Sequence, residues 1–410
     1  MRIDADTVHR IRRNTPGVSG VIHLDNAGAA FPSTKTLDAQ IGHLRLEAAI
    51  GGYEAKAAAA EALAGVRTSA ARLMNASPDE IAIPTSDTAG WAKVFWGFAF
   101  GGGFANRRRV VIDRIFYNSH YLSLLQAKKQ FGIEIAVAPS DESGRVDVDR
   151  FAELLDERVA LVSMTMAPTH SGIVNPVAQM GVHTRAAGVP YFVDGCQALG
   201  QLVVDVDEIG CDALTGTGRK WLRGPRGTGL LYVRKSFQDR CDPPGIDGTS
   251  AVWESASSYS LSVTGARFEE FENSSAGQIG LGVAIDEALA LGLDAIGERV
   301  QYLAHRLRSE LALRGRVTVQ ETLPAPQGRS SFELMPGACS GIVTFLVDGV
   351  APADIVTAAA KAGINMNASS ATWARLDLEA RGVTDVARVA PHVYNTDEEL
   401  DRLLAVIDAL

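Results

Sequence analysis

Short apolar runs rich in β-branched residues alternate with stretches of helical periodicity between about residues 68 and 235. Runs of this length, bounded by turn residues, predict buried β-strands. Because strands that alternate with helices need crossover connections, the pattern predicts an α/β domain with a mainly parallel sheet covered on both faces. The seven predicted strands are residues 80–84, 108–113, 133–139, 159–166, 190–195, 212–217 and 228–233, with helices at 86–99, 119–131, 148–155 and 176–187.

The pattern changes after about residue 275. One long helical run, residues 277–315, precedes an apolar strand within 340–349, a helix near 352–362 and a closing helix over 396–410. This order predicts a smaller α+β C-terminal domain that follows a connecting helix. We expect three parts: residues 1–25 as an N-terminal segment that packs with the small domain, 26–275 as the large domain, and 276–410 as the connecting helix with the small domain.

Composition excludes several classes of protein. With 46% hydrophobic and 21% charged residues the chain is typical of globular proteins and not of disordered ones. The net charge of -9 argues against a general nucleic-acid or anionic-membrane binder. The N-terminus shows no apolar signal region, and no run of about 18 apolar residues occurs. Four cysteines without paired spacing predict a reduced, metal-free, cytoplasmic protein.

Polar residues follow the predicted strands, where an open parallel sheet binds its ligands. Asp194 ends an apolar strand in "FVDGCQ", where an unpaired charge would be costly, so we expect it to face a cation. Lys220 follows another strand on the tight loop of "TGTGRKWLRGPRG". An aspartate that pairs a protonated pyridine nitrogen and a lysine that forms a Schiff base are the two groups that pyridoxal 5'-phosphate (PLP) requires.

Three further features fit this cofactor. Ser86, Asp87 and Thr88 open a predicted helix, where free backbone N–H groups favour a phosphate. Thr217 lies on the same loop as Lys220, and Tyr117 follows a neighbouring strand, where it could stack on a flat ring. Each feature alone has a simpler interpretation: a capping carboxylate, a helix N-cap or an aromatic residue at a pocket rim. Their combination favours the cofactor.

The chain resembles the class V aminotransferase and cysteine desulfurase family, fold-type I enzymes that use PLP. The resemblance covers nearly the whole chain and rests on "VIHLDNAGAAFPS" (21–33), the block from "DGCQALGQ" to "GTGLLYV" (194–233) and "VARVAPHVYNTDEELDRLL" (386–404). It implies that Lys220 holds the cofactor and shuttles protons, that Asp194 pairs the ring nitrogen, and that Gln197 binds the phenolic oxygen. Thr169 stands where the family has asparagine.

The resemblance also implies how phosphate and substrate bind. Ser86, Asp87, Thr88 and Thr217 would surround the phosphate, and Asn273 or Ser274 would reach the phosphate of a partner subunit, in a homodimer with shared active sites. Arg388 would clamp the carboxylate of a small amino-acid substrate, with Asn26 and Asn367 beside it. The alternative for Arg388 is a surface salt bridge with Asp385.

The departures from the family pattern bear on the reaction. Arg219 and Tyr117 stand where desulfurases commonly have histidines, and residues 363–377 lack the cysteine that attacks the substrate sulfur. Cys196 is expected in the core, and Cys339 is expected to be buried and inert. We expect the loops 50–60, 245–262 and 363–380 to shape the pocket.

The leading hypothesis is a PLP-dependent carbon–sulfur β-lyase that acts on a cysteine S-conjugate and releases thiol, pyruvate and ammonia. The "RKWLRGPRGTG" variant resembles isopenicillin N epimerase-like proteins and the C–S lyases of lincosamide biosynthesis, which implies secondary metabolism, antibiotic biosynthesis included. Decarboxylation-coupled oxidative deamination and an epimerase or aminotransferase remain alternatives, and a desulfurase is disfavoured. No G-x-G-x-x-G motif follows the first predicted strand of this chain, which disfavours a nicotinamide dehydrogenase. Retention of Lys220, Asp194 and Arg388 together disfavours a non-catalytic binding protein.

Overall fold

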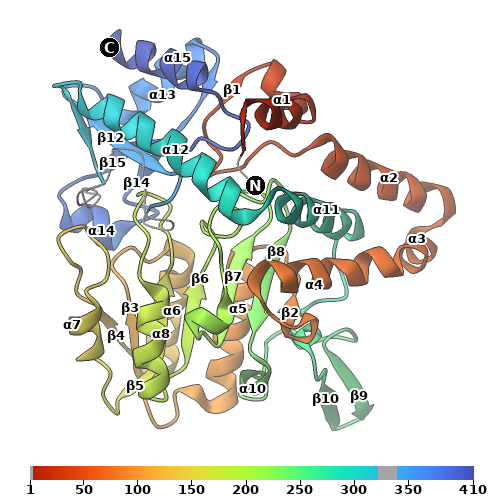
Figure 1. Cartoon of the computed structure of the whole chain (residues 1–410). Coiled ribbons are helices and arrows are strands. Elements are labelled where there is room, and N and C mark those ends of the chain that lie inside the picture. Colours follow the sequence, from red (N-terminus) through yellow and green to blue (C-terminus); the bar gives the residue numbers. More distant parts are fainter. Residues whose placement is uncertain (1–2, 322–338) are drawn as a thin grey trace.

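A seven-stranded sheet forms the centre of the large unit (Figure 1). This computed structural model of the chain describes residues 3–321 and 339–410. The strand order is β2-β8-β7-β6-β5-β3-β4, and only β8 runs antiparallel to its neighbours. The predicted α/β fold and all seven predicted strands are therefore confirmed. The strands are β2 (Ile81–Ala82), β3 (Arg109–Ile112), β4 (Glu134–Val137), β5 (Val159–Thr165), β6 (Tyr191–Asp194), β7 (Ala213–Thr217) and β8 (Gly229–Val233).

Helices cover both faces of this sheet. Consecutive strand residues, such as Val110 and Val111, belong to two different apolar cores, because successive side chains of a strand point to opposite faces. One core includes α5 (Asp87–Phe98), α6 (Asn118–Phe131) and α10 (Lys235–Gln238). The other includes α4 (Ala60–Met74), α7 (Val148–Ala152), α8 (Val177–Ala186), α9 (Val206–Ile209) and α11 (Ser275–Leu291). Burial on both faces explains why the inner strands are apolar throughout.

A second, antiparallel sheet of order β11-β12-β15-β14 forms the smaller unit. Its core also takes in Ile22 and Leu24 from the N-terminal segment. There β1 pairs in parallel with β13, and Asp25 bridges to Ala390. The elements of this unit are β11 (Val317–Val319), β12 (Val343–Val347), α13 (Pro352–Lys361), β13 (Ile364–Asn365), β14 (Asn367–Ser370), α14 (Arg375–Ala380), β15 (Asp385–Val389) and α15 (Asp397–Asp408), with β1 at Ile22–His23.

The connection between the two units differs from the prediction. Instead of one long helix, α11 ends at Leu291 and α12 (Leu293–Ala312) begins after Gly292. Gly292 has φ 87°, a conformation that breaks the helical path and that side chains with a Cβ rarely adopt. The single connecting helix predicted from periodicity was therefore wrong, because the apolar pattern continues through the break.

The remaining elements lie at the periphery. A hairpin of β9 (Ala251–Ser255) and β10 (Ser258–Leu261) projects from the large unit (Figure 1). The N-terminal helices are α1 (Ala5–Arg13), α2 (Thr34–Ile50) and α3 (Gly52–Ala58). Within residues 3–321 and 339–410, none of the helices is both long enough and apolar enough to cross a bilayer.

Candidate active site

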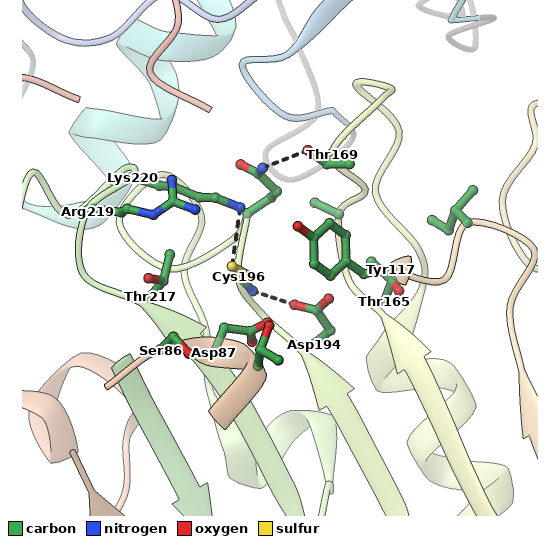
Figure 2. A pocket seen from close by; sticks show the side chains of 14 residues that line it. Ser86, Asp87, Tyr117, Thr165, Thr169, Asp194, Cys196, Thr217, Arg219 and Lys220 are labelled. Atoms are coloured by element: carbon green, nitrogen blue, oxygen red, sulfur yellow. Dashed lines mark hydrogen bonds between the residues drawn. The ribbon is translucent and has the colours of Figure 1, made fainter. Parts of the chain in front are cut away.

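A cavity lies at the carboxyl ends of β5, β6 and β7, beside the first turn of α5 (Figure 2). It encloses about 510 Å³, open solvent at its mouth included. Nine predicted site residues line it: Ser86, Asp87, Thr88, Tyr117, Thr169, Asp194, Gln197, Thr217 and Lys220. Its other lining residues are Ile115, Thr165, Ala167, Cys196 and Arg219.

Lys220 lies in the connection between β7 and β8. The backbone N–H of Gly218 donates to Thr228 O at 3.0 Å, and that of Gly224 donates to Gly218 O at 2.7 Å, which fixes this loop. Lys220 is only 7% exposed, and its Nζ lies 3.3 Å from Cys196 Sγ. Among residues 3–321 and 339–410, no carboxylate lies within ion-pairing distance of this amine. A buried amine without a counterion is suited to a covalent bond with a carbonyl group.

Asp194 and Gln197 also line the cavity, in the turn that follows β6. Asp194 Oδ1 accepts a hydrogen bond from the backbone N–H of Cys196 at 2.8 Å. Burial, together with the nearby Asp87 carboxylate, raises the pKa of Asp194 to about 6. Gln197 Oε1 accepts from Trp221 Nε1 at 2.8 Å, and Gln197 Nε2 donates to Ala27 O at 3.1 Å. The packing of Trp221 therefore orients Gln197.

The first turn of α5 provides an anion site. Ser86 is the N-cap, and its side chain accepts from the backbone N–H of Ala89 at 3.1 Å. Thr88 Oγ1 lies 2.9 Å from Ser119 Oγ. Helix N-termini leave several backbone N–H groups without intrahelical partners, and these groups favour a phosphate. A Cβ at Gly229 would come within 2.6 Å of the Ser86 backbone, so glycine there lets β8 approach this turn closely.

Tyr117 precedes α6 and reaches the cavity from the side opposite Lys220 (Figure 2). Its ring is nearly parallel to Trp373, with 11° between the planes and 6.4 Å between the centroids. Burial and the neighbouring Cys196 raise the pKa of Tyr117, so its hydroxyl stays protonated at neutral pH. The aromatic residues in the three loops expected to shape the pocket are all exposed, and of these only Trp373 stacks on a described cavity residue.

Arg388 is buried behind the cavity. Its Nη1 donates to Thr169 O at 3.1 Å and to Thr169 Oγ1 at 2.9 Å, and its Nη2 pairs with Asp25 Oδ1 at 2.7 Å. The alternative of a surface salt bridge with Asp385 was wrong, because Arg388 is 6% exposed and pairs with Asp25. Its Nε has no hydrogen-bond partner among the described residues.

Four other predicted residues lie outside the cavity lining. Asn26 is buried, donates to Ala390 O at 2.7 Å and accepts from the Tyr394 hydroxyl. Asn367 is exposed and its Nδ2 lies 3.4 Å from Asp25 Oδ2. Asn273 donates to Glu270 O at 3.0 Å, and Ser274 is the N-cap of α11. The contacts of Asn26 and Asn367 join the N-terminal segment to the smaller unit, whereas those of Asn273 and Ser274 are local.

The structure confirms the prediction of a buried Cys339 and contradicts the prediction made for Cys196. Cys339 is buried, as predicted, with Sγ 3.7 Å from Arg308 Nη1. The prediction of Cys196 as a core residue was wrong, because Cys196 lines the cavity, where the turn after β6 places it beneath Lys220. Burial and the nearby carboxylate of Asp87 strongly raise the pKa of the Cys196 thiol, which is therefore protonated.

Sequence reasoning missed His120 and Asp25. His120 lies three residues after Tyr117 on α6, where its Nε2 is 3.2 Å from Asp87 Oδ2. Asp25 follows β1 and holds Arg388. The spacing of His120 from Tyr117 marks a shared helix face, but no pattern in the chain pairs either residue with its partner.

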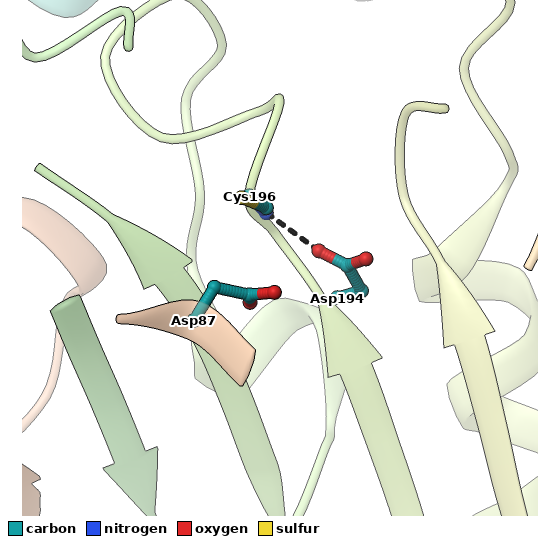
Figure 3. Close-up of side chains that lie close together, drawn as sticks. All are labelled: Asp87, Asp194 and Cys196. Carbon is teal, nitrogen blue, oxygen red and sulfur yellow. Dashed lines mark hydrogen bonds between the residues drawn. The ribbon is translucent and has the colours of Figure 1, made fainter. Parts of the chain in front are cut away.

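Asp87, Asp194 and Cys196 gather on one side of the cavity, with ligand atoms within 4.8 Å of one another (Figure 3). A thiolate would be needed to bind a metal ion, and the raised pKa of Cys196 disfavours it. Asp87 Oδ1 is buried without a hydrogen-bond partner among the described residues. Two carboxylates in this place suit a protonated pyridine nitrogen. Together with the N-terminus of α5 and the Lys220 amine, which has no counterion among the described residues, these groups make a cavity that fits PLP.

Comparisons with known proteins agree with this geometry. The family model described as aminotransferase class-V matches residues 22–403. A cysteine desulfurase from Salmonella choleraesuis (strain SC-B67) is 30% identical over 395 residues, which cover 93% of this chain and 91% of that protein. The structure of an apo cysteine desulfurase from Thermococcus onnurineus NA1 matches with a TM-score of 0.86 at 23% identity, covering 98% of this chain and 97% of that one.

A third similar protein is the cystine C–S lyase C-DES, solved in complex with its product cysteine persulfide. It matches with a TM-score of 0.82 at 20% identity, covering 96% of this chain and 99% of that chain. In another C-DES structure, a lysine mutant carries glycine covalently linked to the PLP cofactor. These two likenesses show a shared fold. With the family match over almost the whole chain, they lead to one conclusion: this chain belongs to the class V aminotransferase family and is a PLP-dependent enzyme.

Proposed function

We propose that the enzyme is a carbon–sulfur β-lyase that acts on a cysteine S-conjugate in secondary metabolism, such as antibiotic biosynthesis. The reaction would convert the conjugate and one water molecule into a thiol, pyruvate and ammonia. The bond that breaks joins the β-carbon to sulfur, and the α-proton ends on the leaving thiol. The sulfur leaves as a thiolate, so the reaction needs no nucleophilic cysteine.

The state of the thiols supports this proposal over desulfuration. Persulfide formation needs an accessible thiolate, and a lowered pKa increases the fraction of the thiol in that form. Residues 363–377 contain no cysteine. The chain has four cysteines; Cys196 is held under Lys220 with a raised pKa, and the other three are buried. The chain therefore offers no activated sulfur nucleophile at the cavity.

The side chains around the cavity can perform the remaining steps. PLP, when bound, supplies an electron sink for bond cleavage at the substrate α-carbon. In our proposal the Lys220 amine removes the α-proton and returns it to the departing sulfur. Arg388, positioned by Thr169, holds the substrate carboxylate in exchange for its contact with Asp25. Asn26 and Asn367 support this region, and Tyr117 with Trp373 limits water access.

Product analysis tests the proposal. The holoprotein would be incubated with S-benzyl-L-cysteine as a probe, and thiol, pyruvate and carbon dioxide would be measured. We expect thiol and pyruvate in equal amounts. Carbon dioxide release with thiol retention would instead indicate decarboxylation-coupled oxidative deamination, recovery of the D-isomer would indicate an epimerase, and an oxo acid with intact sulfur would indicate an aminotransferase. Each of these three outcomes would overturn the lyase proposal.

Replacement of Lys220 tests the assigned base. We expect Lys220→Ala to reduce thiol release by about 10³-fold or more, because one residue both holds the cofactor and moves the proton. Borohydride reduction followed by peptide mass mapping should place the cofactor on Lys220 in the wild type. Lys128→Ala, on the exposed end of α6, is the matched control and should keep wild-type turnover. Unchanged thiol release by Lys220→Ala would exclude this mechanism.

We further propose a homodimer in which Asn273 and Ser274 of one subunit approach the phosphate site of the other. Both residues lie outside the cavity of their own subunit. Exposed aromatic rings lie near them: Phe271 contacts Tyr53, with 6.5 Å between ring centroids. A cytoplasmic location also remains a proposal, in keeping with four free thiols.

A further inference from the structure

A buried histidine lies between two buried carboxylates next to the cavity. His120 Nε2 is 3.2 Å from Asp87 Oδ2, and His120 Nδ1 is 3.7 Å from Asp194 Oδ2. All three side chains are at most 7% exposed. The three residues come from different elements: Asp87 from the first turn of α5, His120 from α6 and Asp194 from the end of β6. Figure 3 shows how the two carboxylates converge from α5 and β6.

Packing fixes the imidazole ring in this position. The ring stacks on Trp91, with 4.6 Å between centroids and 13° between planes, and the edge of Phe116 closes another side. His120 is 1% exposed, so water cannot replace the two carboxylates as its partners. A buried imidazole in contact with two acids is more favourable in its charged form, because a neutral ring would leave two negative charges close together.

The net charge around His120 depends on the other titratable groups nearby. Besides Asp87 and Asp194, the titratable groups near His120 are Asp113 at the end of β3 and Tyr117, just before α6. Lys220 faces the two carboxylates, and Cys196 donates its backbone N–H to Asp194. Burial raises the pKa of Asp113 to about 8, so this group is mostly neutral at pH 7. Asp87 and His120 therefore compensate each other, which leaves Asp194 available to a ligand cation.

We propose that His120 is a positioning residue that, anchored by Asp87, keeps Asp194 ionised where it meets the cofactor ring nitrogen. This gives Asp87 a different task from phosphate binding, since its carboxylate would repel a phosphate. The backbone N–H groups of α5 still serve the phosphate. The inference rests on the placement of Asp194 at the ring nitrogen.

The directions of the pKa shifts agree with this geometry. Burial alone would lower the pKa of His120, but the carboxylates of Asp87 and Asp194 raise it above 6.5. Burial alone would raise the pKa of Asp87, but the charges of His120 and Lys220 lower it below its usual value. Both shifts favour the ion pair Asp87–His120 over its neutral form.

Titration of the cofactor-free protein tests the ion pair without any dependence on the reaction. In protein labelled with ¹⁵N-histidine, the His120 signal is identified by its loss in His120→Phe. We expect His120 to titrate above pH 6.5 in the wild type and at least one pH unit lower in Asp87→Asn, where burial dominates. A wild-type His120 that titrates at or below pH 6.5 would overturn the proposal.

Cofactor affinity tests the consequence for Asp194. His120→Phe keeps a ring against Trp91 and removes the charge, so a purely structural role predicts unchanged binding. We expect its dissociation constant for PLP to rise at least tenfold and the pH dependence of binding to shift. We expect Asp87→Asn combined with His120→Phe to lose less affinity than His120→Phe alone, because the combined variant leaves no uncompensated Asp87 charge. His183→Phe, on α8, is the matched control and should bind normally.

The outcomes separate this inference from the cofactor assignment. If the wild type takes up no PLP, the placement of Asp194 at a ring nitrogen fails, while the histidine titration still reports on the ion pair. If the wild type binds PLP and His120→Phe binds it equally well with the same pH dependence, His120 only packs against Trp91. That second result would overturn the positioning role and leave the cofactor site intact.

Discussion

Among the residues without a role in the proposed reaction, Asp113 has one of the most strongly shifted pKa values. It follows β3, is 1% exposed and accepts a hydrogen bond from the backbone N–H of Thr165. Its Oδ1 has no hydrogen-bond partner among the described residues. Burial raises its pKa to about 8; the Thr165 N–H opposes this rise and Asp194 adds to it. The folded protein therefore holds a proton here that the unfolded chain has already lost above about pH 4.

This proton makes the stability of the cofactor-free protein depend on pH. Because the folded-state pKa is raised, the stabilising contribution is complete below about pH 4 and is lost as pH rises toward 8. Relative to Asp113→Asn, the free energy of unfolding of the wild type should fall by about 1.4 kcal/mol per pH unit between pH 5 and 7. Urea titrations of both proteins measure this difference. Parallel pH profiles would show that Asp113 is ionised throughout.

At the residue scale, the sequence could predict the groups that follow strands. Asp194, Thr217 and Lys220 end or follow apolar runs, so their place at one sheet edge follows from parallel topology. His120 and Cys196 could not be found this way, because their roles depend on the orientation of a helix and a turn. Asn26 stands in a motif shared with the family, yet its hydrogen bonds are made to Ala390 and Tyr394.

At the scale of elements, the seven strands were predictable because burial on both faces demands continuous apolar residues. The break at Gly292 was not, since Leu291 and Leu293 maintain the apolar periodicity across it. The conformation of Gly292, with φ 87° and ψ 122°, is a property of the backbone that hydrophobic patterns do not report. The short β9–β10 hairpin was also missed, because its strands are largely exposed and contribute no residue to the buried apolar cores.

Replacement of Gly292 tests whether this backbone conformation is required. No atom lies closer than 4.0 Å to the position of an added Cβ, so the effect reports backbone strain and not a clash. We expect Gly292→Ala to lower the free energy of unfolding by about 1–3 kcal/mol. Gly42→Ala, within α2 and exposed, is the matched control and should instead raise it by up to about 1 kcal/mol. If thermal or urea unfolding shows the same change in stability for both variants, the backbone conformation of Gly292 is not required.

At the scale of the whole molecule, the exposed aromatic residues near the hairpin favour self-association. Trp253 is 81% exposed and Tyr53 is 75% exposed. In sedimentation velocity we expect the wild type to behave as a dimer of about twice the chain mass of 43.5 kDa. Trp253→Asp should weaken the dimer at least tenfold and reduce PLP retention with it. Leu313→Asp, at the equally exposed Leu313 after α12, is the control. A fully active monomer would contradict the dimer.

The distances in sequence between the cavity residues have a consequence for the lifetime of the protein in the cell. Asp87, Asp194 and Lys220 meet only when the pairings β2–β8, β8–β7 and β7–β6 are complete. Such long-range pairings form late, because loop closure must precede them. A ligand that binds only the finished sheet withdraws chains from the unfolded pool that proteases degrade. The abundance of this enzyme should therefore follow the supply of vitamin B6, independently of how strongly its gene is expressed.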